Sequence, residues 1–284
     1  MTIHRPRISI IPKIICRFTR SSSDYRGKQK IIKWLLRNKG LFRSIKPQRV
    51  FIKDVGKMEL IPNDFVDKYL FITGSYEKEV VDKFTAILQL NDNVIDVGAN
   101  IGYFSLLASK LVGTNGMVFS FEVSPPILSR LKRNIQINSI ENIVIFPFAV
   151  SNKVGSAEFY ISENMNSGLS SLRSIDGTSH ILVDTMTLDS VLDRLPKIKV
   201  IKMDIEGAEG MALEGMVKLL NRDRPHILME LTDSFLRQLG SRADDLVGRL
   251  QELNYEVTDC NGTVIDLKST PIQQCNIYCS PMNN

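Results

Sequence analysis

The sequence has no uninterrupted apolar run of about 18 residues, because charged residues break every long apolar stretch before that length. The first residues also lack an apolar segment that ends in a small-residue cleavage site. These two absences argue against a membrane-spanning helix and against a secretory signal. We therefore expect an intracellular, cytoplasmic protein.

Cysteine is scarce as well. The four cysteines, Cys16, Cys260, Cys275 and Cys279, form no CxxC pair and are too few for the disulfide scaffold of a small secreted protein. No cluster of histidines accompanies Cys275 and Cys279, so we predict no zinc site. Buried thiols in a reducing compartment are the simpler expectation.

Acidic residues are nearly absent from the first 49 residues, which hold 14 lysines and arginines but only one acid, Asp24. This segment carries a net charge of +13, whereas the rest of the chain, with 22 basic and 30 acidic residues, carries −8. We predict a basic N-terminal appendage over residues 1–73 and one larger domain over residues 74–284. A solvated basic arm is its simpler role, and peripheral contact with anionic lipid or acidic glycan is the alternative. No nucleic-acid-binding motif accompanies the charge, so we expect no binding to DNA or RNA.

From about residue 90 onward, short apolar runs alternate with turns and helical stretches, which is typical of a parallel sheet covered by helices. We predict strands at residues 94–97, 117–121, 143–148, 198–203, 227–231, 255–259, 263–267 and 276–279. We predict helices at residues 29–38, 101–111, 125–138, 208–220 and 243–253. Asn261-Gly262 is a hairpin signal and predicts an antiparallel finish. The expected fold is a Rossmann-like, doubly wound α/β sheet, mostly parallel, with an antiparallel C-terminal end and helices on both faces.

The segment from Asp96 to Gly102 joins a predicted strand to a predicted helix, at the sheet edge where open α/β folds bind ligands. Gly98 permits a sharp turn and close approach to a ligand, Asn100 suits a helix start, and Gly102 permits close helix contact. A purely structural turn is the alternative. Position at the strand end favours a binding site.

Glu122 follows the next strand, about twenty residues after Gly102, where a carboxylate can accept hydrogen bonds from both hydroxyls of a ribose. A dinucleotide site would also need a further glycine where Ala99 and Asn100 stand, so that backbone amides can reach a pyrophosphate. An acid at Asp96 is unfavourable beside phosphates but suits a ligand that carries an ammonium group. The pattern therefore predicts a nucleoside ligand without a diphosphate.

Several motifs together resemble the FkbM-type methyltransferase family. They are the turn at residues 96–104, Phe121-Glu122, residues 134–138, Ala149-Val150, residues 202–209 (KMDIEGAE) and the entry segment at residues 74–77. The resemblance covers roughly residues 74–231, although Glu122-Val123-Ser124-Pro125 replaces the more usual Glu-Pro. It implies a class I methyltransferase fold that uses S-adenosylmethionine and methylates hydroxyls of sugars or secondary metabolites. The acceptor is then a small molecule or a glycan.

The resemblance also assigns roles to individual residues. It implies that Asp96, Gly98, Asn100 and Gly102 line the methionine and ribose end of the cofactor, that Glu122 binds the ribose, and that Ala149 lies near the adenine. Tyr76 and Glu77 close over the cofactor only on this analogy. The loop at residues 162–178, rich in serine, asparagine and glycine, is expected at the mouth of the site, where it would influence acceptor choice.

Methylation of an alcohol also requires a base, and the three histidines, His4, His180 and His226, have no suitable setting. Asp204 ends the strand expected beside the first one, so we predict that it faces the reactive end of the cofactor. Glu206 and Glu209 are two further catalytic candidates. They would share a helix face if the helix has begun by Glu206, although acids are favoured in a first helical turn for their own sake.

Three alternatives stay open at this point. Asp204, Glu206 and Glu209 also suit a divalent cation, although we predict no metal site. Glu230 either reaches the acceptor cleft or is a solvated acid at a strand end. A nicotinamide-dependent oxidoreductase, or a non-catalytic membrane- or glycan-binding protein with the same fold, remains the alternative to a methyltransferase.

Overall fold

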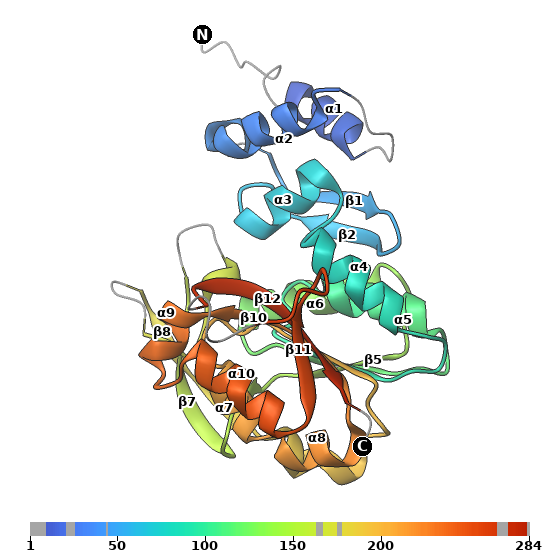
Figure 1. Ribbon diagram of the computed structural model, residues 1–284. Coiled ribbons are helices and arrows are strands. Elements are labelled where there is room, and N and C mark those ends of the chain that lie inside the picture. Colours follow the sequence, from blue (N-terminus) through green and yellow to red (C-terminus); the bar gives the residue numbers. More distant parts are fainter. Residues whose placement is uncertain are drawn as a thin grey trace.

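The computed structural model describes residues 10–20, 26–43, 45–162, 167–174, 178–265 and 272–282 (Figure 1). Its centre is a seven-stranded sheet with the order β11-β12-β10-β9-β3-β4-β5. The strands are β3 (Val94–Val97), β4 (Val118–Phe121), β5 (Ile143–Phe146), β9 (Val200–Met203), β10 (His226–Thr232), β11 (Tyr255–Asp259) and β12 (Gln274–Pro281). The neighbours from β10 to β5 are parallel, and β12 is antiparallel to both β10 and β11. The expected doubly wound, mostly parallel sheet with an antiparallel C-terminal end is confirmed.

Successive residues of the central strands supply two different hydrophobic cores. Val94 and its neighbour Val200 pack into one core, whereas Ile95 and its neighbour Ile201 pack into the other. Side chains alternate between the two faces of a sheet, so a strand buried on both faces is apolar at every position, as β3 nearly is. The exception in β3 is Asp96, which is 1% exposed. A buried acid in such a strand needs a specific reason.

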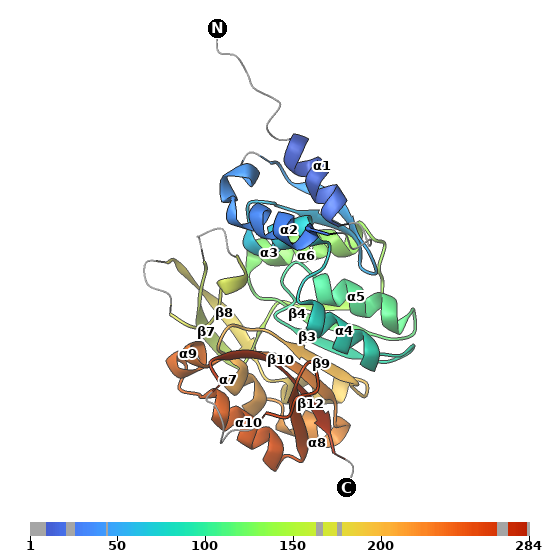
Figure 2. The ribbon, with the colours of Figure 1, turned by 45° about the horizontal axis from the view of Figure 1, so that its top comes forward.

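Helices cover both faces of this sheet (Figure 2). One face carries α4 (Lys78–Ile87), α5 (Tyr103–Val112) and α6 (Pro125–Gln136). The other carries α7 (Glu209–Glu214), α8 (Val217–Asp223), α10 (Ala243–Glu252) and the 3₁₀ segment η3 (Leu188–Arg194), with α9 (Asp233–Gln238) following β10. The chain runs from β3 to β4 on one side and later returns to β9 on the other side of β3. The direction in which successive strands are added to the sheet therefore reverses at β3, and doubly wound folds bind ligands at such a point.

Two predicted elements after β9 are wrong in detail. The Asn261-Gly262 turn forms, with Gly262 at φ 95°, but residues 263–265 contribute only a single bridge from Val264 to Thr258, and residues 266–267 lie outside the described part. The antiparallel partner of β11 is β12, which inserts between β10 and β11. The helix predicted at residues 208–220 is two helices, because the chain breaks at Gly215 and Met216 between α7 and α8.

The region between β5 and β9 folds into a second, three-stranded sheet that the sequence pattern did not predict. Its strands are β6 (Ala149–Val150), β7 (Gly155–Tyr160) and β8 (His180–Met186), in the order β6-β8-β7, with the 3₁₀ segment η2 (Ser167–Leu169) nearby. β8 pairs with β7 antiparallel and with β6 parallel. This small sheet stands at the carboxyl-end edge of the central sheet.

The N-terminal region is a separate layer that packs on the same face as α5 and α6 (Figure 1). It comprises α1 (Ile10–Thr19), α2 (Lys28–Arg37), the 3₁₀ segment η1 (Lys39–Phe42), the hairpin of β1 (Gln48–Ile52) and β2 (Gly56–Leu60), and α3 (Phe65–Thr73). The backbone N–H of Glu59 donates to Asn134 of α6, and that of Lys57 donates to Asn138 just after α6, at 2.8 Å each. Arg130 of α6 also pairs with the buried Asp67 of α3. The domain boundary at residues 73/74 stays a prediction. Over the described residues, no helix is both long enough and apolar enough to cross a bilayer.

Candidate active site

A cavity of about 390 Å³ opens at the carboxyl ends of β3, β4, β9 and β10, a size that suits a small ligand. Six carboxylates line it, namely Glu77, Asp96, Glu122, Asp204, Glu206 and Glu230, and Lys202 is the one lysine or arginine among its described lining residues. A space with this excess of acids attracts a cation and disfavours phosphate. The sequence-predicted residues Gly98, Asn100 and Ala149 also line it, whereas Gly102 and Glu209 do not.

The turn after β3 is held against the end of β9. Gly98 has a φ of 80°, and a Cβ added to it would lie 1.9 Å from the carbonyl oxygen of Asp204. Asp204 N–H in turn donates to Val97 O at 3.0 Å. The sequence predicted close approach to a ligand at Gly98, and the structure adds a close approach to the neighbouring strand end. Any side chain here would push the two halves of the cavity floor apart.

Gly98→Ala is therefore expected to destabilise the fold by about 3 kcal/mol or more, because it combines a left-handed φ with a backbone collision. Gly248→Ala is the matched control, since a Cβ at this helical glycine meets nothing within 4 Å and alanine favours a helix. Urea denaturation of both variants measures the difference. Equal unfolding midpoints for Gly98→Ala and the parent protein would contradict the packing described here.

Glu122 lies at the end of β4, is 9% exposed and faces the cavity. Its two carboxylate oxygens accept N–H groups of Asn100 at 2.9 Å and Ser124 at 2.8 Å. Burial raises the pKa of Glu122 to about 7, against the lowering effect of these backbone donors. These two hydrogen bonds hold the side chain in place. Each carboxylate oxygen keeps a second lone pair, so Glu122 can still accept hydrogen bonds from two hydroxyl groups.

Asp96 lines the same cavity as Glu122 and can bind a second group of one ligand. Its Oδ2 accepts the Ser105 hydroxyl at 2.5 Å, but its Oδ1 is buried with no hydrogen-bond partner among the described residues. Burial raises the pKa of Asp96, and Lys202 opposes this rise. An unpaired buried carboxylate oxygen is costly, and an ammonium group of a bound ligand, direct or through water, would satisfy it. The donor set therefore fits a nucleoside that carries an amino-acid group, as S-adenosylmethionine does.

Gly102 and Asn100 shape the turn. Gly102 has a φ of 92°, and a Cβ there would come within 2.6 Å of Leu131 in α6, so this glycine permits the expected close helix contact. Helix α5 begins at Tyr103, two residues later than expected. Asn100 has a φ of 50°, and its Oδ1 accepts the Ile101 N–H. Ala149 begins β6 and is 9% exposed on the cavity wall.

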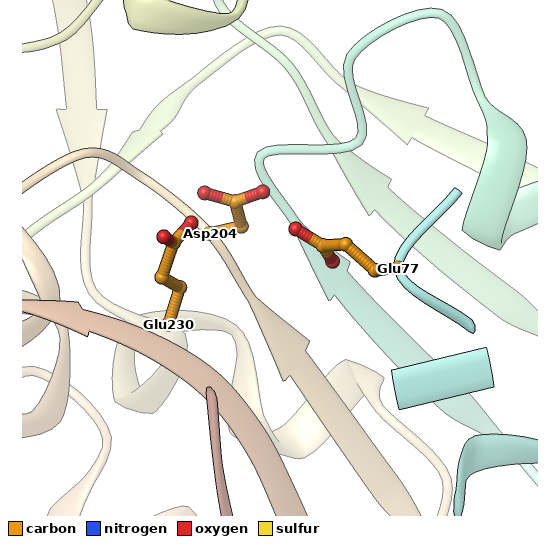
Figure 3. Close-up of side chains that lie close together, drawn as sticks. All are labelled: Glu77, Asp204 and Glu230. Carbon is orange, nitrogen blue, oxygen red and sulfur yellow. The ribbon is translucent and has the colours of Figure 1, made fainter. Parts of the chain in front are cut away.

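Glu77, Asp204 and Glu230 converge from three different elements (Figure 3). One carboxylate oxygen from each lies within 4.8 Å of the others. Lys202, 5% exposed, donates to Asp204 Oδ2 at 3.1 Å, and Gln274 donates to Glu230 at 2.6 Å. Glu230 thus reaches the cavity and is not a solvated strand-end acid. The structure groups Asp204 with Glu77 and Glu230, and the sequence had grouped it with Glu206 and Glu209.

Burial and neighbouring charges both shift the pKa values in this cluster. Burial lowers the pKa of Lys202, but Asp204, Glu77 and Asp96 raise it more, so its ammonium stays protonated. Burial raises the pKa of Glu77, Lys202 lowers it, and Asp204 and Glu230 raise it further. Burial and then Asp204 also raise the pKa of Glu230. Lys202 thus partly neutralises the cluster and fixes the orientation of the Asp204 carboxylate.

The shared helix face expected for Glu206 and Glu209 is absent, because α7 begins only at Glu209. Glu206 lies in the preceding turn at φ 54° and lines the cavity. Glu209 is 1% exposed and accepts the N–H groups of Ile205 at 3.1 Å and Gly207 at 3.0 Å. Glu209 therefore holds the turn that presents Glu206. Strained conformations of this kind persist at functional sites.

Glu206 gives a pH-dependent stability difference. Burial, Asp204 and Glu230 hold its pKa well above the usual value, so the folded protein binds a proton there more tightly than the unfolded chain. The proton-linked stability is complete below the unfolded pKa near 4.5 and is lost as pH rises toward the folded pKa. Relative to the parent protein, Glu206→Gln should therefore raise the free energy of unfolding of the ligand-free protein by about 1 to 2 kcal/mol more at pH 8 than at pH 5. Chemical denaturation at both pH values tests this, with the exposed Glu252→Gln as control. If the change in unfolding free energy between pH 5 and pH 8 is the same in Glu206→Gln and Glu252→Gln, the prediction is wrong.

Several cavity residues had no role in the sequence-based prediction. Lys202 is the clearest, although a lysine inside the fully buried strand β9, two positions before Asp204, is itself a signal, because such side chains share a face. Phe235, Thr232 and Gln274 come from α9, β10 and β12. Arg173 stacks at 3.9 Å on the ring of Phe235. These residues meet only through tertiary packing, so no local motif marks them.

Comparisons with known proteins find similarity to methyltransferases. The family model "Methyltransferase FkbM domain" matches residues 96–257, and the model "Protein-L-isoaspartate(D-aspartate) O-methyltransferase (PCMT)" matches residues 36–152. The chain is 24% identical over 188 residues to Methyltransferase 1 of Beauveria bassiana, covering 59% of this chain and 71% of that protein. It is 27% identical over 146 residues to the hexuronic acid methyltransferase AglP of Haloferax volcanii, covering 51% of this chain and 58% of that protein. A solved methyltransferase FkbM from Methylobacillus flagellatus KT aligns with a TM-score of 0.46 at 14% identity, covering 95% of this chain and 58% of that chain.

Proposed function

Since this chain belongs to the FkbM methyltransferase family, whose model matches residues 96–257, we propose that it methylates a hydroxyl group on a sugar, glycan or secondary metabolite. It is a methyltransferase, and S-adenosylmethionine is its cofactor. The observation that carries the hydroxyl assignment is the position of Asp204 in the same cavity as Glu122. A hydroxyl acceptor must lose a proton on methylation, and Asp204 is a carboxylate placed to take it.

One side of the cavity binds the cofactor and the other side binds the acceptor. When bound, S-adenosylmethionine supplies an electrophilic methyl group on a sulfonium centre. Glu122 and Asp96 hold the ribose hydroxyls and the ammonium group over β3 and β4. Asp204, Glu206 and Glu230 lie over β9 and β10, on the other side of β3 in the strand order. An acceptor on that side reaches the methyl group from the direction in which Asp204 is available as a base.

Lys202 and the neighbouring acids position the catalytic base and the acceptor on this side of the cavity. Lys202 orients the Asp204 carboxylate, and Glu77 and Glu230 accept hydrogen bonds from further hydroxyls of the acceptor. Holding the reacting groups in line and excluding water contributes a large part of a methyl transfer rate. Phe235 adds an aromatic surface beside these polar groups, a combination that suits a sugar ring.

The charge of the cavity favours a neutral acceptor. Six acids line the cavity against one lysine, and even with part of them protonated through burial they disfavour an acceptor that carries its own negative charge. A neutral sugar hydroxyl is therefore preferred over a hexuronate or a phosphate ester. The relative AglP, named as a hexuronic acid methyltransferase, supports a sugar acceptor, and the PCMT family name supports oxygen methylation. The preference for a neutral sugar comes from this chain's own acids.

The experiment is a transfer assay with methyl-labelled S-adenosylmethionine and an acceptor panel of neutral sugars, hexuronic acids, amino sugars and phenolic alcohols. We expect label in a neutral sugar, attached through an ether oxygen that NMR can identify. Label on nitrogen, or on hexuronic acids alone, would contradict the proposal. Saturable binding of S-adenosylhomocysteine in the same preparation separates an inactive protein from a wrong acceptor.

A further inference from the structure

The outer sides of helices α1 and α2 expose large apolar side chains. Ile14 is 63% exposed, Phe18 56% and Trp34 51%, while the opposite sides of the same helices bury Cys16 and Leu35 completely. The buried sides account for the packing of both helices on each other and on α3. None of these three exposed side chains is among the residues of the described core of this layer, and large exposed apolar side chains on two packed helices indicate an interaction surface.

Cations interleave with these apolar groups. Arg17 shares the exposed side of α1 with Ile14 and Phe18, and Lys33 and Arg37 share that of α2 with Trp34, at the three- and four-residue spacing of a helix face. Within the described residues, none of these three cations has an acidic side chain within ion-pair distance. The outer face is defined here as Ile14, Arg17, Phe18, Lys33, Trp34 and Arg37.

Charge is segregated along the whole chain. Residues 1–49 carry +13 and the remainder −8, with the acidic cavity in the second part. A negatively charged surface would therefore attract the N-terminal layer and repel the rest, which orients the molecule on contact. In both views the α1 and α2 layer forms one end of the molecule, away from β11 and α8 (Figures 1 and 2).

We propose that the outer face docks on an anionic lipid bilayer, with its apolar side chains at the headgroup level and its cations on the lipid phosphates. Apolar and basic residues mixed on one amphipathic surface, with an aromatic group among them, are suited to a membrane interface. A purely electrostatic partner would leave Ile14, Phe18 and Trp34 unexplained. A purely apolar partner would leave beside it three cations that have no ion pair among the described residues.

The full chain offers a direct probe, because Trp34 is its one tryptophan. Two vesicle types are compared, pure phosphatidylcholine and phosphatidylcholine with phosphatidylglycerol as about a third of the lipid. We expect co-sedimentation and a blue shift of Trp34 emission only with the anionic vesicles, weakened by salt. Equal binding to neutral vesicles, or binding without a blue shift, overturns the proposal. So does self-association that changes Trp34 emission in the absence of vesicle binding.

Variants distinguish the outer face from net charge. The triple variant Arg17→Glu, Lys33→Glu, Arg37→Glu should bind anionic vesicles at least about 100-fold more weakly, because each basic side chain near such a surface is worth about a fivefold change. The matched control, Lys153→Glu, Lys197→Glu, Lys218→Glu, has the same net charge and changes three exposed lysines elsewhere. It should bind within about fivefold of the parent protein. An equal loss in both triple variants overturns the proposal, and thermal melts confirm that both fold.

Discussion

Asp204→Asn is expected to lower the rate of methyl transfer by about 100- to 10,000-fold, the usual contribution of a positioned general base. Asparagine keeps the shape of the side chain and can still accept a hydrogen bond from Lys202, but it cannot take a proton from the acceptor hydroxyl. Because Asp204 lies on the β9 side of the cavity, away from Glu122, cofactor affinity should change little. The expected signature is a loss of kcat with the binding of S-adenosylhomocysteine preserved.

Single-turnover assays with labelled cofactor, at saturating acceptor, measure the chemical step directly. The matched control is Asp184→Asn, an exposed acid of β8 outside the cavity, which should retain the parent rate. If Asp204→Asn keeps more than about a tenth of the parent rate, Asp204 is not the base. Glu230→Gln and Glu77→Gln would then be the next variants to measure, since their carboxylates lie in the same cluster.

The central sheet could be predicted closely because its strands carry their signal locally. Val94–Val97 and Tyr255–Asp259 begin and end where the sequence pattern places them, since apolar runs between turns suffice to define buried strands. The position of β12 could not be predicted in the same way. Its insertion between β10 and β11 depends on which strand edges remain unpaired after the rest of the sheet forms, and a hairpin signal at Asn261-Gly262 says nothing about that.

The cofactor side of the site was predictable for a similar reason. Gly98, Asn100 and Glu122 lie within two consecutive strand ends, so spacing along the chain fixes their neighbourhood. The acceptor side was predictable only in part. Asp204 follows from its strand end, but Glu77, Glu230 and Lys202 join it from a helix start and two strands, through contacts that no local motif encodes. Glu209 accepts backbone N–H groups of a turn and does not line the cavity, a placement that the motif alone does not reveal, and its catalytic role stays a prediction.

Glu122→Ala should weaken the binding of S-adenosylhomocysteine by about 100-fold. The variant removes two hydrogen bonds from ribose hydroxyls to a carboxylate, each worth about 1.5 kcal/mol or more. It also frees the N–H groups of Asn100 and Ser124, which loosens the turn that the ribose rests on. Glu122→Gln keeps one acceptor oxygen and the side-chain volume, so its loss should be smaller, about tenfold.

The pH dependence of binding separates this role from a structural one. The pKa of Glu122 is raised to about 7, so its carboxylate gains a proton as pH falls below 7 and loses the capacity to accept from both ribose hydroxyls. Affinity of the parent protein should therefore fall by up to about tenfold for each pH unit below 7, whereas Glu122→Gln should show a flat profile over the same range. Calorimetric titration at pH 6 and pH 8 measures both, with the exposed Glu252→Gln as the control that keeps the parent profile. Because a damaged fold would lower affinity at every pH, only loss of the pH dependence assigns the ribose contact to Glu122. A Glu122→Gln profile as steep as that of the parent would instead assign the titrating group to another cavity acid, with Asp96 the next to test.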